Sequence, residues 1–280
     1  MNKNFLLRKY RSAILQSKND FRLESSKQNL DLMHKNFDPI FVLTTGRSGS
    51  KLIASILEKE ILIDSFHEPF PNLKLMNNKA FHSQANEEYL KGVFEAARIE
   101  RIFSSFQKHK KYFESNQCIT FFAYIIDDLF PNSKFIHLIR DPADFVLSAY
   151  KLGWYEEDTL WEQGRIKDEN NWGSLDRIEK LYWLWNQTNI YIDDFKKSID
   201  ESRIKTIKSE DLFNNLNSVE NIIQFIGVEN IDKKKISKLQ KKPINNKKKF
   251  KTQIHDNIKT KIIKHKNSLA DKHVISKYNY

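Results

Sequence analysis

Two strand–turn–helix segments constrain the fold of this 280-residue chain more than any other feature. The first covers residues 41–53 and reads FVLTTGRSGSKLI, and the second covers residues 134–150 and reads KFIHLIRDPADFVLSAY. Each begins with a short apolar run that is typical of a buried parallel strand, and continues past a polar turn with apolar residues at helical spacing. Strands that alternate with helices predict an α/β fold, a three-layer sandwich with a central parallel sheet, in which both turns lie at the carboxyl edge.

The rest of the chain continues this alternation. Further strands are predicted over residues 61–66 and 203–208, and helices over 73–115, 121–129, 175–195 and 217–226. We expect residues 1–37 to form a basic, helical extension. Residues 38–280 are expected to form a single domain, whose segment from about residue 230 onward is rich in lysine.

The first turn has the composition of an anion-binding loop. Gly46 and Gly49 let the backbone bend tightly and approach a ligand closely. Backbone N–H groups then open the helix, whose N-terminus carries a positive partial charge. These groups belong to Ser48, Gly49, Ser50 and Lys51. With the guanidinium of Arg47 as a fixed cation, the turn can hold one phosphate-like group.

The same turn does not match the loop that binds nucleoside triphosphates. That motif needs a glycine, four residues and then Gly-Lys-Ser or Gly-Lys-Thr. Here Gly49 is followed by Ser50, and Thr44 stands where the first glycine belongs. Because this match fails, a P-loop kinase or NTPase is an alternative and not the leading interpretation. We also expect no metal in the site.

The second turn offers a second anion site. Arg140 follows the strand, and Asp141 and Pro142 suit the N-cap and the first position of the next helix. Ser148 lies about two turns further along that helix. Because Arg140 and Ser148 can both face the edge where the first turn lies, the two turns suggest one ligand with two separated phosphate-like groups.

Both segments resemble the two signature segments of the sulfotransferases that use PAPS (3′-phosphoadenosine 5′-phosphosulfate). The resemblance rests on TTGRSGS at residues 44–50 and IRDPADFVLS at residues 139–148. The Arg-Ser-Gly form is similar to the carbohydrate and tyrosylprotein branches of the family. SEDL at 209–212 and KYNY at 277–280 resemble later parts of the family pattern.

The resemblance implies a P-loop nucleotide-hydrolase-like fold and PAPS as the sulfonyl donor. It also implies that the first segment binds the 5′-phosphosulfate, and that Arg140 and Ser148 bind the 3′-phosphate. Negative charge grows on the bridging oxygen as the sulfonyl group leaves, so Arg47 is the candidate for the cation that stabilises it. The acceptor would be a hydroxyl of a sugar, a tyrosine, a lipid or a small alcohol.

A base must take the proton of that acceptor, and two candidates follow the second predicted strand. His67 and Glu68 stand at the same sheet edge as Arg47. In the tyrosylprotein branch the proposed base is a glutamate at this spacing, which corresponds to Glu68, and His67 is the second candidate. The sequence departs from many relatives at 115–120, where a lysine and a proline are missing. A charge there would have to come from Lys110 or Lys111, or the element is lost.

Composition and net charge limit the kinds of partner that this protein is expected to bind. The net charge of +11 and the pI near 9.4 favour a polyanionic ligand, so a non-catalytic basic module that binds polyanions is a further alternative. Nucleic acid is not the expected partner. The single cysteine, Cys118, excludes an intrachain disulfide, and no apolar run is long enough for a membrane span. We therefore expect a cytoplasmic protein that binds a nucleotide donor and a hydroxyl acceptor.

Overall fold

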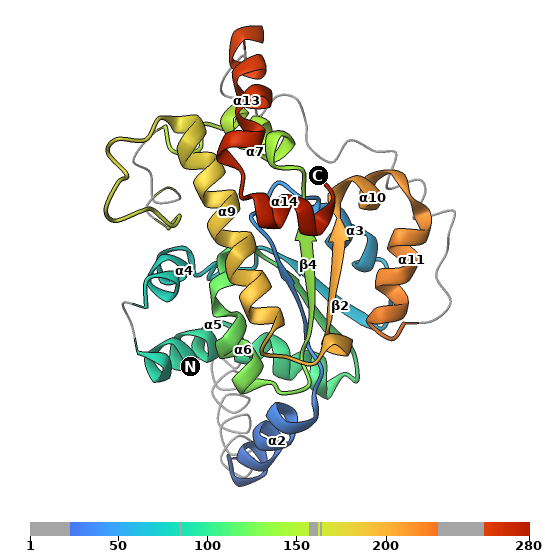
Figure 1. The fold of residues 1–280 in the computed structure, drawn as a ribbon. Coiled ribbons are helices and arrows are strands. Elements are labelled where there is room, and N and C mark those ends of the chain that lie inside the picture. The colour runs from blue at the N-terminus through green and yellow to red at the C-terminus, as the bar shows by residue number, and fades with distance from the viewer. Residues whose placement is uncertain (1–22, 84–85, 157–161, 163, 229–254) are drawn as a thin grey trace, which may run out of the picture.

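The computed structural model describes residues 23–83, 86–156, 162, 164–228 and 255–280, and its centre is a five-stranded sheet (Figure 1). The strands are β1 (Ile40–Leu43), β2 (Ile63–His67), β3 (Lys111–Ser115), β4 (Lys134–Ile139) and β5 (Ile204–Lys208). All neighbouring strands are parallel, in the order β2-β3-β1-β4-β5. The predicted α/β class with a parallel central sheet is confirmed.

Helices cover both faces of this sheet. One face carries α3 (Ser50–Leu57), α10 (Ser209–Asn214) and α11 (Leu216–Phe225). The other face carries α2 (Leu23–Asn36), α5 (Glu87–Gln107), α6 (Ala123–Leu129) and α9 (Arg177–Lys196). The carboxyl edge and its surroundings are built with α4 (Lys74–Phe81), η1 (Gln117–Phe122), α7 (Pro142–Lys151), α13 (Asp256–Leu269) and α14 (Lys272–Tyr278). A short 3₁₀ turn, η2 (Glu201–Arg203), leads into β5. Within the described residues, every helix is too short or too polar to cross a membrane.

The central strand shows why its sequence is apolar without interruption. Phe41 and Leu43 point into the core under α5 and α6, whereas Ile40 and Val42 point into the core under α3 and α11. All four side chains are fully buried. A strand with helices on both faces buries every residue, so it reads as a continuous apolar run instead of an alternating one.

The strand order places the two motif turns side by side. β1 lies in the middle of the sheet, with β3 on one side and β4 on the other. The chain leaves β1 toward one edge and later returns to the opposite side of β1, which makes this position a topological switch point. Ligands of open parallel sheets bind at such a point, beyond the carboxyl ends of the strands.

One predicted element is wrong. Residues 73–115 were expected to be helical, and α4 and α5 are helices, but Lys111–Ser115 forms β3 between β1 and β2. The strand contains Glu114, a charged residue with a fully buried side chain. Its charge is compensated by Arg98 of α5, which lies elsewhere in the chain, so the local pattern carries no sign of a central strand.

The two lysines before and within β3 do not reach the carboxyl edge. Lys110 Nζ lies 3.1 Å from Asp64 Oδ1, and Lys111 pairs with Asp38. Both pairs lie at the amino end of the strands. Neither lysine therefore supplies a charge to the region of residues 115–120, where many relatives carry one.

The core contains a buried histidine, His137, whose surroundings change its pKa. His137 of β4 is fully buried, and its Nε2 donates to Asn189 Oδ1 at 2.9 Å. Its Nδ1 lies 2.8 Å from Lys196 Nζ and accepts from it. Burial, and next the positive charge of Lys196, lower the pKa of His137 from 6.5 to about 3. The imidazole therefore stays neutral in the folded protein.

This histidine should make the protein sensitive to acid. In the unfolded chain His137 takes up a proton below its ordinary pKa of 6.5, whereas in the folded protein it does so only near its lowered pKa of about 3. Stability is therefore lost as the pH falls through this window. Between about pH 6.5 and 4.5, we expect the His137→Gln variant to lose about 2 kcal/mol less unfolding free energy than the parent protein. Urea unfolding at a series of pH values measures this, and parallel pH dependences for the two proteins would contradict it.

Candidate functional site

The loop that follows β1 is anchored by buried hydroxyl groups. The Oγ1 of Thr120 accepts a hydrogen bond from the backbone N of Thr44 and donates one to its carbonyl, both at 3.0 Å. The hydroxyls of Thr44 and Ser48 also bond to each other. On the other side, Ser209 Oγ lies 2.7 Å from the carbonyl oxygen of Ser48 and 2.9 Å from that of Ile139. The loop is thus tied to η1, α10 and the end of β4.

The backbone of this loop adopts left-handed conformations. Gly46, Arg47 and Gly49 have φ angles of 81°, 56° and 93°. Glycine tolerates this region, but an arginine there is uncommon and often marks a functional site. A Cβ at Gly46 would lie 2.4 Å from Gln117 Oε1 and 3.3 Å from the Trp154 ring, so the close approach of these side chains also requires glycine.

The loop ends at the N-terminus of α3, which is open to an anion. Gly49 is the N-cap, and no side chain among the described residues caps this helix. Gly49 O already accepts hydrogen bonds from Leu52 N and Ile53 N, at 2.8 and 3.2 Å. The N–H groups of Ser50 and Lys51 are therefore the ones placed for an external acceptor, and the helix dipole favours a negative one.

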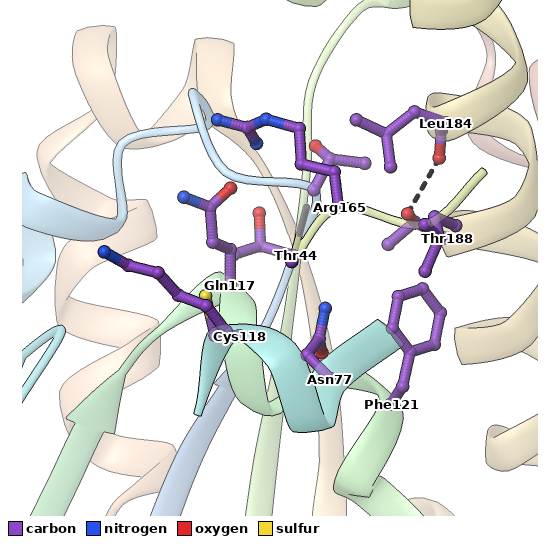
Figure 2. A pocket seen from close by; sticks show the side chains of 12 residues that line it. Thr44, Asn77, Gln117, Cys118, Phe121, Arg165, Leu184 and Thr188 are labelled. Carbon is purple, nitrogen blue, oxygen red and sulfur yellow. Dashed lines mark hydrogen bonds between the residues drawn. The ribbon is translucent and has the colours of Figure 1, made fainter. Parts of the chain in front are cut away.

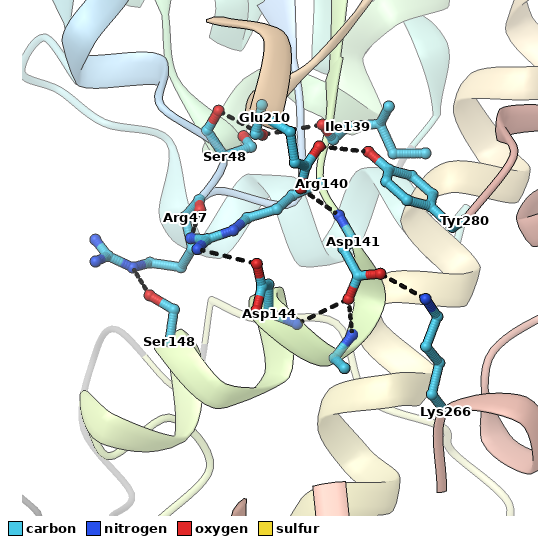
Figure 3. A network of polar contacts seen from close by, with 12 residues as sticks. Arg47, Ser48, Ile139, Arg140, Asp141, Asp144, Ser148, Glu210, Lys266 and Tyr280 are labelled. Atoms are coloured by element: carbon cyan, nitrogen blue, oxygen red, sulfur yellow. Dashed lines mark hydrogen bonds and ion pairs between the residues drawn. The ribbon is translucent and has the colours of Figure 1, made fainter. Parts of the chain in front are cut away.

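The two motif turns are in direct contact (Figure 3). Arg140 Nη1 donates a 2.8 Å hydrogen bond to the carbonyl of Arg47. Arg47 Nε in turn donates to Ser148 Oγ at 3.1 Å. The structure thus brings together Arg47, Arg140 and Ser148, which the sequence placed at one edge. The contact between Arg140 and Asp144 is long, at 3.8 Å, so it leaves the guanidinium open to another anion.

Asp141 has a structural task in the second turn. It is the N-cap of α7, where its side chain accepts hydrogen bonds from the backbone of Ala143 and Asp144, and Pro142 takes the first helical position. Lys266 of α13 pairs with it at 2.6 Å. The expected capping role is confirmed, and Arg140 is not held by an ion pair with its neighbour.

Cations dominate the electrostatics of the loop. Burial is the largest effect that lowers the pKa of Arg47, and the positive charges of Arg140 and Arg165 lower it further. Glu68 acts in the opposite direction. A partly buried arginine surrounded by two others has an unfavourable environment unless an anion binds there.

Both candidate bases lie at the end of β2 on the same edge. Glu68 has φ 48°, and its backbone N donates to Ser115 O at 3.0 Å. Gln117 Nε2 lies 3.4 Å from Glu68 Oε1. His67 Nδ1 lies 2.9 Å from Ser115 Oγ, and burial lowers the pKa of His67 below 6.5. The negative charge of Glu68 raises the pKa of Arg47, so this carboxylate lies near the cationic loop.

Several residues of the site were missed by the sequence analysis. Gln117 follows β3, the strand that was not predicted. Arg165 lies over the Trp154 ring at 3.3 Å, in a loop without a local pattern. Glu210 Oε1 accepts from Asp141 N at 3.0 Å, and its Oε2 accepts from the hydroxyl of Tyr280 at 3.1 Å. Of these residues, Glu210 and Tyr280 could have been found from the sequence, because they belong to the late family-like segments at 209–212 and 277–280.

A pocket opens beside the start of the loop (Figure 2). It encloses only about 30 Å³, between α4, η1, residues 164–166 and α9. Thr44 and Thr45 form one wall, and Phe121 and Leu184 contribute apolar surface. Asn77 also lines it, and the Oδ1 atom of this side chain is buried without a partner among the described residues. The pocket thus has a mixed polar and apolar lining that includes one unpaired amide oxygen.

Comparison with known proteins identifies the family. The model of the sulfotransferase family matches residues 39–232, so the chain belongs to this family. A search of curated proteins finds no match. The site described above therefore belongs to an enzyme that transfers sulfonyl groups, and not to a P-loop kinase or a non-catalytic basic module.

Solved structures agree with this fold. The sulfotransferase domain of the Synechococcus PCC 7002 olefin synthase has a TM-score of 0.50 at 15% identity, over 88% of this chain and 96% of its own. The sulfotransferase domain of the curacin biosynthetic pathway has a TM-score of 0.52 at 17% identity, over 88% and 99%. A sulfotransferase from Alicyclobacillus acidocaldarius has a TM-score of 0.51 at 14% identity, over 82% and 92%. At these identities the likeness concerns the fold alone.

The loop geometry predicts opposite effects for two glycine substitutions. Gly46→Ala should destabilise the protein by about 1–3 kcal/mol, because the new methyl group is strained at positive φ and displaces Gln117. Gly92→Ala is the matched control in α5, where an added Cβ meets nothing within 4 Å. It should stabilise by about 0.5–1 kcal/mol. Urea unfolding of both variants checks this, and equal changes would show that the loop does not need glycine.

Proposed function

We propose that this sulfotransferase uses PAPS as its donor and passes the sulfonyl group to a hydroxyl acceptor. The observation that carries the proposal is the contact between the two motif turns. Arg140 Nη1 bonds to Arg47 O at 2.8 Å, and Arg47 Nε bonds to Ser148 Oγ at 3.1 Å. Two anion-binding elements so close together suit a nucleotide that carries phosphate-like groups at two positions of one ribose.

The residues present fit such a donor. The uncapped N-terminus of α3 and Arg47 would hold the 5′-phosphosulfate. Arg140 and Ser148 would hold the 3′-phosphate, for which an arginine and a hydroxyl are common partners. The loop residues proposed to contact the donor through the backbone are Gly46, Ser48, Gly49, Ser50 and Lys51. Nothing in this set requires a metal ion.

The reaction exchanges one S–O bond for another. The bond between sulfur and the bridging oxygen of the donor breaks, and a bond between sulfur and the acceptor oxygen forms in line with it. The acceptor hydroxyl gives its proton to Glu68, and adenosine 3′,5′-bisphosphate leaves with the negative charge. Arg47 and the N–H groups of the loop stabilise that charge before and after transfer. His67 is the second candidate for the base.

The pocket of Figure 2 supports a route for the acceptor. It adjoins Thr44 and Thr45 on one side and Gln117, the neighbour of Glu68, on the other. An acceptor that enters there would bring its hydroxyl between the loop and the proposed base. The enclosed space of about 30 Å³ admits only the hydroxyl-bearing end of a sugar, tyrosine, lipid or small alcohol, whose body would lie outside it.

The 3′-phosphate site can be tested with two nucleotides that differ in that group alone. Arg140→Ala should weaken binding of adenosine 3′,5′-bisphosphate roughly 10-fold or more, because a charge-assisted hydrogen bond contributes about 1.5–3 kcal/mol. Binding of adenosine 5′-phosphate, which lacks the group, should change much less. Isothermal titration calorimetry of both ligands measures the difference. An equal loss for the two nucleotides would place Arg140 at the 5′ end or in the general scaffold.

The proposed base is tested by an isosteric change. Glu68→Gln keeps size and polarity but removes the proton acceptor, so turnover should fall roughly 10²–10⁴-fold. Binding of adenosine 3′,5′-bisphosphate should be nearly unchanged. The assay is transfer of label from PAPS to an acceptor found by screening sugars, phenols and alcohols. His67→Gln is the matched variant. Full turnover of Glu68→Gln together with a large loss for His67→Gln would move the base to His67.

A further inference from the structure

A fully buried ion pair lies behind the segment that carries Glu68. Arg98 of α5 and Glu114 of β3 both have side chains with 0% exposure. Arg98 Nε donates to Glu114 Oε2 at 2.7 Å, and Nη2 donates to Oε1 at 3.0 Å. This is the bidentate geometry that fixes a guanidinium and a carboxylate in one orientation.

The carboxylate is held from further sides. Tyr112 OH donates to Glu114 Oε2 at 2.7 Å, and Asn116 Nδ2 donates to Oε1 at 3.1 Å. Together with the two bonds from Arg98, four donors surround the carboxylate. The orientation of the guanidinium is therefore set by the sheet and not by its own flexible side chain.

The Nη atoms of the Arg98 guanidinium donate hydrogen bonds to the backbone of the segment after Glu68. Arg98 Nη1 donates to the carbonyl of Pro71 at 2.6 Å, and Nη2 lies 3.5 Å from the carbonyl of Pro69. Prolines have no N–H group, so carbonyls are what a partner can hold at these two positions. On the opposite side Glu68 N donates to Ser115 O at 3.0 Å. The segment is clamped between α5 and the carboxyl end of β3.

The segment held between Arg98 and Ser115 begins at Glu68, whose backbone is strained. Glu68 has φ 48°, a conformation that non-glycine residues keep only when the surrounding structure imposes it. A buried ion pair is a poor way to gain stability, because apolar residues of the same volume often serve as well. Unlike an apolar pair, Arg98 and Glu114 provide N–H donors that are aimed at fixed carbonyl groups. Lysine lacks the planar fork that does this.

We propose that Arg98 and Glu114 are positioning residues for Glu68, and that they hold its carboxylate beside the donor loop. This inference rests on the proposed role of Glu68 as the base. Arg98 and Glu114 touch neither donor nor acceptor, so they should affect turnover and leave donor binding alone.

The first test is Arg98→Lys, which keeps the charge and loses the fork. The turnover number should fall roughly 10–100-fold, as expected for a misplaced reacting group. The dissociation constant of adenosine 3′,5′-bisphosphate should stay within about twofold, which also shows that the variant is folded. Glu114→Gln is the second variant and should behave alike, in case Arg98→Lys does not fold. Gly92→Ala is the control, because it changes the same helix at a position where an added Cβ meets nothing within 4 Å, and it should keep its turnover.

The second test is a double-mutant cycle. If Arg98 acts through Glu68, adding Arg98→Lys to Glu68→Gln should lower the remaining turnover by less than about twofold. Two losses that multiply would overturn the positioning role, and so would a full turnover number in both Arg98→Lys and Glu114→Gln. A Glu68→Gln variant with full turnover is a different failure, since it removes the proposed base itself.

Discussion

The site depends on one constraint, the parallel sheet with β1 in its middle. Because all five strands run the same way, each of them ends at the same edge and can deliver a polar group there. β1 and β4 lead to Arg47 and Arg140, β2 leads to Glu68, β3 leads to Gln117, and β5 leads to Ser209. Residues that are far apart in the chain thus meet without long loops. The order of the strands then decides which groups are neighbours, and it places the two arginines side by side.

Two residues of the proposed site have strained backbones. Arg47 and Glu68 both have left-handed backbones, at φ 56° and 48°. Such conformations cost of order 1–3 kcal/mol each and persist when neighbouring bonds impose them. At Arg47 the neighbour is Arg140, which bonds to the carbonyl of the strained residue at 2.8 Å. At Glu68 it is the carbonyl of Ser115, with Arg98 behind the following prolines. In both places an arginine binds a carbonyl, so the same kind of contact holds the proposed cation and the proposed base.

Charge in the site is balanced by pairs at its rim, and the centre is left positive. Asp141 pairs with Lys266, and the ion pair of Arg140 within the described residues is a long one, 3.8 Å to Asp144. The pKa of Arg47 is lowered by burial and by neighbouring cations. A bound anion would remove this unfavourable term, so donor binding and the stability of the loop are linked. A bound anion would add a counter-charge to the one that Glu68 provides.

The sequence predicts those parts of the fold and site that local chemistry determines. The glycines of the loop, the cap at Asp141 and the apolar run of β1 each follow from neighbours in the chain. The shared edge of Arg47, Arg140 and Ser148 could be anticipated, because both motifs follow strands of one parallel sheet. The direct bond between Arg47 and Ser148 was not predicted.

The parts that could not be predicted depend on compensation between distant elements. Residues 73–115 were predicted to be helical because charged and apolar positions alternate along them, so β3 was missed. The charge of Glu114 is acceptable in this strand because Arg98 of α5 lies against it. Because the strand was not predicted, Gln117 just beyond its end was also missed as a site residue. A buried charge without a local partner is therefore informative in retrospect. Such a residue implies a partner elsewhere, and in this protein the partner it implies also holds the segment that carries the proposed base.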